Sequence, residues 1–167
     1  SYHEARLWAT AVAMSGGSVL VNEEISRLSP ARRELIEQVM LPYGKAASPL
    51  DFFELPQPTT AVIEVDASTK LVSRYNWDEK IEDKKLDLAA LGFDGDAIVV
   101  DCWEKQVLGV FNGNMDIYNM MPHSACVYLV KALPSKPSFL FGNSSLFAGV
   151  DIYEADYSDD KLTITAN

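Results

Sequence analysis

The sequence predicts a mainly β fold: a C-terminal antiparallel β-sandwich preceded by a short helix–strand–helix segment of α/β character. Beyond residue 60, short apolar runs alternate with turn residues at a spacing typical of β-sandwiches. Before residue 45, apolar residues recur instead with the period of helices. Hydrophobic residues make up 48% of the 167 residues, which is enough for a packed core.

The first predicted element is a helix over residues 3–14 (HEARLWATAVAM) that is apolar on nearly all sides, with Leu7 and Trp8 at its centre. Such a helix is typical of the interior of a large protein. Residues 15–17 (SGG) end the helix. Residues 18–21 (SVLV) then form a short apolar run, as in a parallel strand that is covered on both faces.

A second helix is predicted over residues 29–41, with Ser29 as N-cap and Pro30 at the first helical position. Its apolar face consists of Leu35, Ile36, Val39 and Met40. A single strand of a parallel sheet cannot satisfy its own backbone groups. Large side chains each gain roughly 1.5–3 kcal/mol from burial. We therefore expect residues 3–42 either to self-associate or to pack their helices on the chain's own sheet.

A linker is predicted over residues 46–60, which hold three prolines and show no clear period. It separates the helical segment at residues 1–45 from a sandwich domain at residues 61–167. Strands of that domain are predicted over residues 61–65, 71–75, 86–88, 98–102, 107–111, 117–121 and 126–130. A last hairpin is predicted over residues 146–157 and 162–165, with its turn at residues 158–160.

Glu23 and Glu24 are adjacent carboxylates, which raises the question of a glycosidase site. Glycosidases use two carboxyl groups roughly 5–10 Å apart on either side of a sugar. Neighbouring side chains on an extended chain point to opposite sides. Solvated or capping carboxylates therefore explain this pair better than a catalytic pair does.

Trp77 and Trp103 are predicted at strand ends, where exposed indole rings can stack on a sugar. Filling the sandwich core or its edge is the commoner role of such rings. Residues two apart share one face of a strand, so Asp101 and Trp103 share a face. We expect the charge of Asp101 to turn that face outward, unless the strand ends or bulges before Trp103. We also expect at least one of the two rings to be buried.

The composition argues against several classes of function. A net charge of −10 repels phosphate backbones, so nucleic acid is not an expected partner. No apolar run approaches the roughly 18 residues of a membrane span. Cys102 and Cys126 match no metal motif, and we expect two free, largely buried thiols. His3 and His123 lie near no second ligand at metal spacing, so neither a metal nor a cofactor is expected.

The chain starts at Ser1 on a segment that is already helical, so we expect it to continue a longer polypeptide. The lack of a signal peptide therefore indicates no cellular compartment.

Residues 4–25 (EARLWATAVAMSGGSVLVNEEI) resemble α-galactosidases of the melibiase type, which are retaining glycoside hydrolases with a TIM barrel and a C-terminal β domain. The similar stretch of those enzymes runs from the seventh barrel helix through the eighth strand. Its helix core, small residues and polar strand end match residues 7–9 (LWA), 15–17 (SGG) and 22–24 (NEE). Residues just past a barrel strand face the active site. The resemblance therefore implies a substrate-site rim made of Asn22, Glu23 and Glu24.

Four motifs of the second half resemble the same family. They are residues 75–77 (YNW), similar to its aromatic-Asn-Trp strand end; 86–92 (LDLAALG), similar to its LDLAxLG turn; 101–103 (DCW), similar to its DxW strand; and 121–124 (MPHS), similar to its PPHS turn. Cys102 stands where an aliphatic residue is usual, and Met121 where a proline often stands. The similarity covers most of residues 4–131, while residues 138–165 resemble an extra hairpin of some relatives.

The resemblance implies that residues 1–45 are the closing segment of a (β/α)8 TIM barrel and that the sandwich is a non-catalytic domain appended to it. In the family, the nucleophile and the acid/base are aspartates at the ends of the fourth and sixth barrel strands. Both precede the stretch that this chain resembles, so the chain holds no catalytic residue and is expected to be inactive alone. The expected partners are the rest of the parent barrel and, for the parent enzyme, a galactoside-type carbohydrate.

Two other functions stay open. The sandwich could be a carbohydrate-binding module that uses Trp77 and Trp103, or a structural or interaction domain of an inactive relative.

Overall fold

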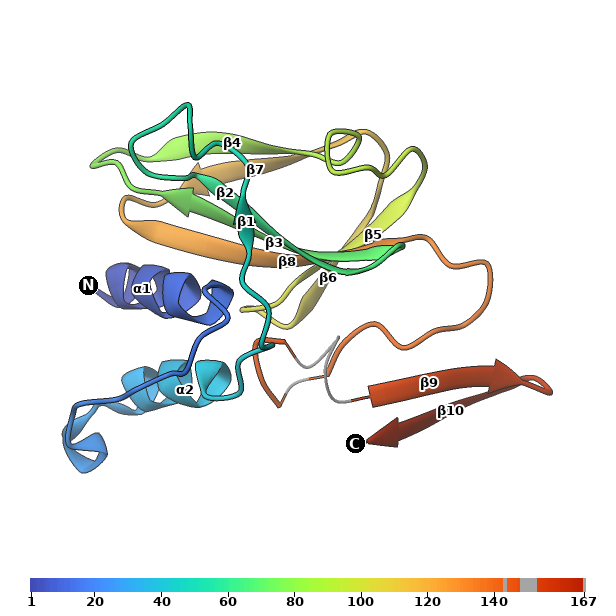
Figure 1. Cartoon of the computed structure of the whole chain (residues 1–167), viewed down its shortest axis with the longest axis horizontal. Helices are drawn as coiled ribbons and strands as arrows, with labels where there is room; N and C mark the ends of the chain where they lie inside the picture. Colours follow the sequence, from blue (N-terminus) through green and yellow to red (C-terminus); the bar gives the residue numbers. More distant parts are fainter. Residues whose placement is uncertain (143, 148–152, 167) are drawn as a thin grey trace.

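The computed structural model describes residues 1–142, 144–147 and 153–166, and within them the protein is mainly β (Figure 1). A central antiparallel sheet has the strand order β1-β2-β3-β8-β5-β6. Its strands are β1 (Ser48–Pro49), β2 (Thr60–Asp66), β3 (Thr69–Asn76), β8 (Ser124–Ala132), β5 (Ala97–Asp101) and β6 (Gln106–Phe111). Two further two-stranded sheets pair β4 (Glu82–Asp87) with β7 (Asn114–Met120), and β9 (Tyr153–Ser158) with β10 (Lys161–Ala166). The predicted fold class is confirmed.

The central sheet carries a hydrophobic core on each of its faces. Side chains such as Val72 and Val99 pack with Leu86 and Ile117 of the β4–β7 pair, which lies above the central sheet in Figure 1. On the opposite face, the neighbouring residue Leu71 packs with Met14 of the first helix. This division follows from the alternation of side chains along a strand.

The first helix, α1 (Tyr2–Met14), begins with a capping box formed by Ser1 and Glu4. It lies along the lower face of the central sheet (Figure 1). Its buried residues are Leu7, Thr10, Ala13 and Met14. The predicted helix is therefore confirmed. Of the two expected outcomes, self-association or packing on the chain's own sheet, the structure shows the packing of α1 on the sheet.

The second helix, α2 (Pro30–Val39), lies beneath α1 in Figure 1. Ser29 has the extended backbone of an N-cap, with φ −61° and ψ 154°, but its side chain makes no capping hydrogen bond. Of the predicted apolar face, Leu35 and Val39 are buried, whereas Met40 is 48% exposed. A short 3₁₀ helix, η1 (Ile25–Arg27), precedes α2 and was not expected from the sequence.

The strand predicted at residues 18–21 does not form in this chain, where these residues pair with no other described segment and the side chain of Leu20 is 91% exposed. A lone extended segment has no ladder partner for its backbone groups. The chain instead turns back after α1. Gly16 adopts φ +70°, and a Cβ atom there would lie 2.4 Å from the backbone carbon of Lys45. The amide of Ala47, which follows α2, donates to the carbonyl of Met14 at 2.8 Å and holds that later segment against the end of α1.

The predicted domain boundaries at residues 45 and 60 stay a prediction. The stretch between them holds β1, which pairs with β2 through Ser48 and Val62. The last hairpin turns at Asp159 and Asp160, whose positive φ angles of 50° and 59° suit a two-residue turn. The part of the predicted strand 146–157 that falls on residues 148–152 lies outside the described residues.

Candidate functional site

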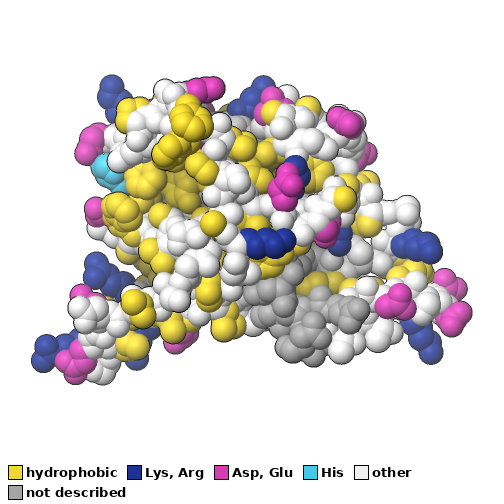
Figure 2. All heavy atoms as spheres, viewed as in Figure 1, with side chains coloured by type: hydrophobic (Ala, Val, Ile, Leu, Met, Phe, Trp, Pro, Cys, Tyr) yellow, Lys and Arg dark blue, Asp and Glu magenta, His cyan; other side chains and the backbone are white. Residues whose placement is uncertain are grey.

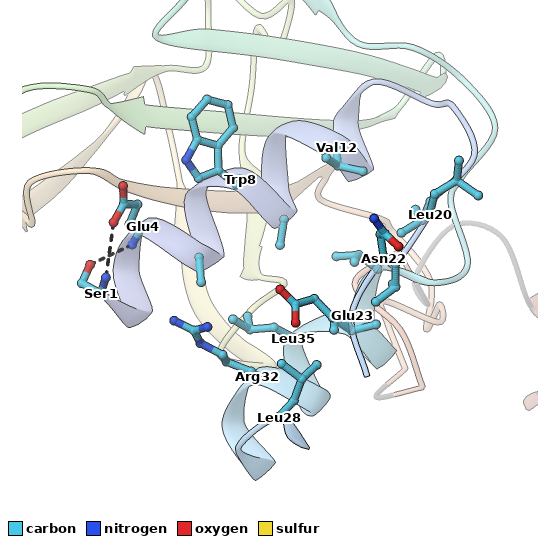
Figure 3. Close-up of a pocket in the computed structure, with 16 residues that line it drawn as sticks. Ser1, Glu4, Trp8, Val12, Leu20, Asn22, Glu23, Leu28, Arg32 and Leu35 are labelled. Atoms are coloured by element: carbon cyan, nitrogen blue, oxygen red, sulfur yellow. Dashed lines mark hydrogen bonds and ion pairs between the residues drawn. The ribbon is translucent and has the colours of Figure 1, made fainter. Parts of the chain in front are cut away.

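A pocket of about 490 Å³ opens between α1, residues 19–23 and α2 (Figure 3). We call it the helix groove. Its walls are mainly apolar, and the apolar lining includes Trp8, Val12, Leu20, Leu28 and Leu35. Polar groups from Ser1, Glu4, Asn22, Glu23 and Arg32 complete the lining. The chemistry of the groove therefore suits an apolar partner segment better than a sugar.

The helix groove exists because α1 carries two apolar faces. Leu7 and Ala13 point into the sheet and are at most 1% exposed. Trp8 and Val12, four residues apart on the opposite side, line the groove and are 58% and 41% exposed. The apolar side chains that predicted a wholly buried helix thus lie on two faces of α1. One face packs on the sheet and the other is open to solvent.

A cluster of contacts ties α1 to the turn between β5 and β6. The guanidinium of Arg6 bonds Glu104 Oε1 at 2.5 Å and lies over the ring of Trp103, 5.2 Å from its centroid. The indole N–H of Trp103 donates to Thr10 Oγ1 at 3.0 Å. Sequence reasoning missed Arg6 and Thr10. The signal available was a single arginine inside an otherwise apolar helix, which needs a partner if it is to be buried.

The expectation that Asp101 faces outward is wrong, because this residue is only 8% exposed. The strand ends at Asp101, and its carboxylate accepts hydrogen bonds from the amides of Trp103 and Glu104 at 2.9 and 3.0 Å. Arg6 Nη2 lies 4.0 Å away. Burial raises the pKa of Asp101, against the opposing effects of these hydrogen bonds and of Arg6.

The predicted rim residues lie together on the chain but only partly in the groove. Asn22 and Glu23 are exposed and line it, and Figure 3 shows the Glu23 carboxylate turned toward the space between the helices. Glu24 lies outside the groove lining. Its carboxylate pairs with Arg27 Nε at 2.9 Å and accepts from Ser26 Oγ at 2.9 Å. A role for any of the three at a substrate site stays a prediction.

Trp77 and Trp103 are both half-buried and belong to different clusters. The ring of Trp77 stacks on Tyr75, with centroids 5.3 Å apart, and meets Trp8 edge-on at 5.9 Å. Its indole N–H donates to the carbonyl of Pro58 at 2.7 Å. Hydrophobic side chains gather over α1 and the adjacent end of the central sheet (Figure 2). Whether the two tryptophans bind sugar stays a prediction.

The two cysteines are free thiols, as predicted. Burial raises the pKa of the Cys102 thiol to about 12, so it is not a nucleophile at neutral pH. Among the described residues, no three His, Cys, Asp or Glu side chains come close enough together to hold a metal ion. In the same part of the chain, no helix has the length and apolarity needed to cross a membrane.

Several solved glycoside hydrolases contain a part with the same fold as this chain. A GH27 β-L-arabinopyranosidase from Geobacillus stearothermophilus matches with a TM-score of 0.68 and 18% identity, over 83% of this chain and 32% of that one. α-Galactosidase I from Mortierella vinacea matches with a TM-score of 0.65 and 13% identity, over 81% and 37% of the two chains. The α-galactosidase of Saccharomyces cerevisiae, solved with raffinose, matches with a TM-score of 0.61 and 11% identity, over 78% and 44%.

No protein-family model and no curated protein matches the amino-acid sequence. The chain spans less than half the length of each of these three enzymes. At this level of identity the likeness concerns the fold. The chain therefore has the mainly β fold found in the C-terminal part of GH27-like enzymes.

Proposed function

We propose that this chain is the C-terminal portion of an α-galactosidase-like glycoside hydrolase, in which it forms a non-catalytic β domain that supports the catalytic barrel. The observation that carries the proposal is the fold match, which covers about four fifths of this chain but only about a third of the GH27 β-L-arabinopyranosidase. The order of sequence motifs, from the LWA helix to the MPHS turn, points to the same enzymes.

The open helix groove is an argument that this chain is part of a larger protein rather than an independent domain. It exposes apolar side chains of α1 and residues 19–23 that a self-sufficient domain would bury. Residues 18–21 are an apolar run without a partner strand among the described residues. In the proposed parent, these residues form the eighth barrel strand, and the strands on either side of it complete the groove.

The alternative of a carbohydrate-binding module has weaker support. One face of the Trp77 ring is covered by Tyr75, and its N–H is already bonded. Arg6 covers the ring of Trp103. A sugar platform needs an open aromatic face, and neither arrangement favours one.

The test is to compare this chain with the polypeptide encoded by its complete reading frame. Both are assayed on p-nitrophenyl α-galactoside, β-L-arabinopyranoside and α-N-acetylgalactosaminide. We expect the complete polypeptide to hydrolyse at least one of these glycosides and this chain to hydrolyse none. Turnover by the chain alone that scales with its concentration would refute a non-catalytic role. A complete polypeptide whose barrel lacks one of the two aspartates would favour the inactive relative.

A further inference from the structure

A second pocket, of about 210 Å³, lies where α1, the turn after β5, β7 and the start of β8 meet. We call it the junction pocket. Arg6 lines it from α1, and Asp101 and Glu104 line it from the end of β5 and the turn that follows. The apolar part of its lining includes Ile117, Met120 and Ala125, which are 8%, 4% and 2% exposed. None of its described residues lines the helix groove, so the two pockets are separate.

Arg6 and Asp101 leave a donor and an acceptor unmatched at this pocket. Asp101 Oδ1 accepts from the amides of Trp103 and Glu104, and Arg6 Nη1 donates to Glu104. Arg6 Nη2 lies 4.0 Å from Asp101 Oδ1, which is beyond hydrogen-bond distance. Within the described residues, neither this nitrogen nor Asp101 Oδ2 has a hydrogen-bond partner. Neither atom is sealed from solvent, so a ligand can reach both.

The unmatched pair is notable because Asp101 is only 8% exposed. Polar groups that are buried to this degree are usually hydrogen-bonded. A hydroxyl group fits between the two atoms, because it accepts from one partner and donates to another at the same time. A hydroxyl of a ligand would thus accept from Arg6 Nη2 and donate to Asp101 Oδ2.

The charges at the junction pocket favour an uncharged ligand. An anion would meet the carboxylates of Asp101 and Glu104, and a cation would meet the guanidinium of Arg6. The volume is also below the roughly 300–1,000 Å³ of pockets for drug-sized ligands, so it suits a smaller molecule. Hydroxyls for the polar pair and C–H groups for the apolar lining are combined in small carbohydrates.

We propose that the junction pocket binds a small uncharged carbohydrate, cyclic or acyclic, through one hydroxyl held between Arg6 and Asp101. The C–H groups of the ligand lie against the apolar lining. This site differs from the tryptophan platform considered above, because its contacts are hydrogen bonds rather than ring stacking. The proposal does not depend on the function proposed above.

The experiment is a ¹H–¹⁵N NMR titration of the 167-residue chain with D-galactose, L-arabinose and galactitol. The first two are ring sugars and the third is an acyclic polyol. We expect at least one of them to shift the amides of Trp103 and Glu104, which bond Asp101, with a dissociation constant on the order of millimolar. Saturation by either form supports the proposal and shows which form the pocket takes.

The test variant is Asp101→Asn, which keeps an acceptor for the two amides but replaces Oδ2 by a donor. The matched control is Asp94→Asn, which removes the same charge at an exposed position outside the pocket. We expect Asp101→Asn to weaken binding about tenfold or more and Asp94→Asn to leave it unchanged. Melting curves confirm that both variants fold. Arg6→Met, which removes Nη2 and keeps an unbranched stem, replaces Asp101→Asn if that variant does not fold.

Three results would overturn the proposal. The first is a chain whose amides respond to none of the three carbohydrates. The second is binding that Asp101→Asn leaves as strong as in the unmodified chain. The third is a set of shifts centred on residues 19–23, which would place the ligand in the helix groove instead.

Discussion

Leu7 and Leu20 allow one substitution to be compared in two environments. Leu7 is 1% exposed and packs against Ala61, Tyr75 and Ala125 of the central sheet. Replacing a buried leucine by alanine removes its transfer free energy and leaves a cavity, for a loss of about 2–5 kcal/mol. Leu20 is 91% exposed, so Leu20→Ala should change the free energy of unfolding by about 0.5 kcal/mol or less.

Urea unfolding of the chain, followed by far-ultraviolet circular dichroism, measures both values. We expect Leu7→Ala to lower the unfolding free energy by at least about 2 kcal/mol more than Leu20→Ala does. Equal losses would refute the packing of α1 on the sheet. In the complete polypeptide of the proposed enzyme, Leu20→Ala should become as costly as a buried substitution, about 2–5 kcal/mol. A neutral Leu20→Ala there would argue against its place in a barrel strand.

Three further predictions concern single contacts. Trp103→Phe removes the indole N–H bond to Thr10 and should lower the unfolding free energy by about 0.5–1.5 kcal/mol beyond any change in packing; a double-mutant cycle with Thr10→Val that shows no coupling would contradict this. Burial acts to raise the pKa of Asp51, but hydrogen bonds from Thr59 and Thr60 outweigh it and hold the pKa below 3.8, so this carboxylate stabilises the fold above that pH and the benefit is lost as the pH falls. Acid titration of stability should therefore be steeper for the unmodified chain than for Asp51→Asn, and parallel curves would argue against the loop contact. Ellman's reagent at pH 8 should leave Cys102 unlabelled until urea unfolds the chain, because its buried thiol has a pKa of about 12; rapid labelling of Cys102 in a folded Cys126→Ser variant would refute that burial.

Local sequence patterns were sufficient for most secondary-structure elements. The period-two runs and their turn residues correctly located the strands from β2 to β8, because a half-buried strand must alternate its side chains wherever its partners lie. The cap at Ser29 and Pro30 likewise placed the start of α2. Residues 18–21 show the limit of this reasoning. An apolar run becomes a strand only where a second strand satisfies its backbone groups, and no described strand does so here.

The candidate site depended on tertiary contacts that no local pattern encodes. The sequence by itself determined that α1 is apolar on nearly all sides, but the sheet decided that Leu7 is buried and that Trp8 faces the helix groove. The charge of Asp101 predicted an exposed face. The early end of β5 and the backbone amides of the following turn buried it instead, beside Arg6, a residue 95 positions away. A charged side chain is buried only where other groups, often distant in sequence, compensate its charge. The tertiary fold determines which groups lie beside it.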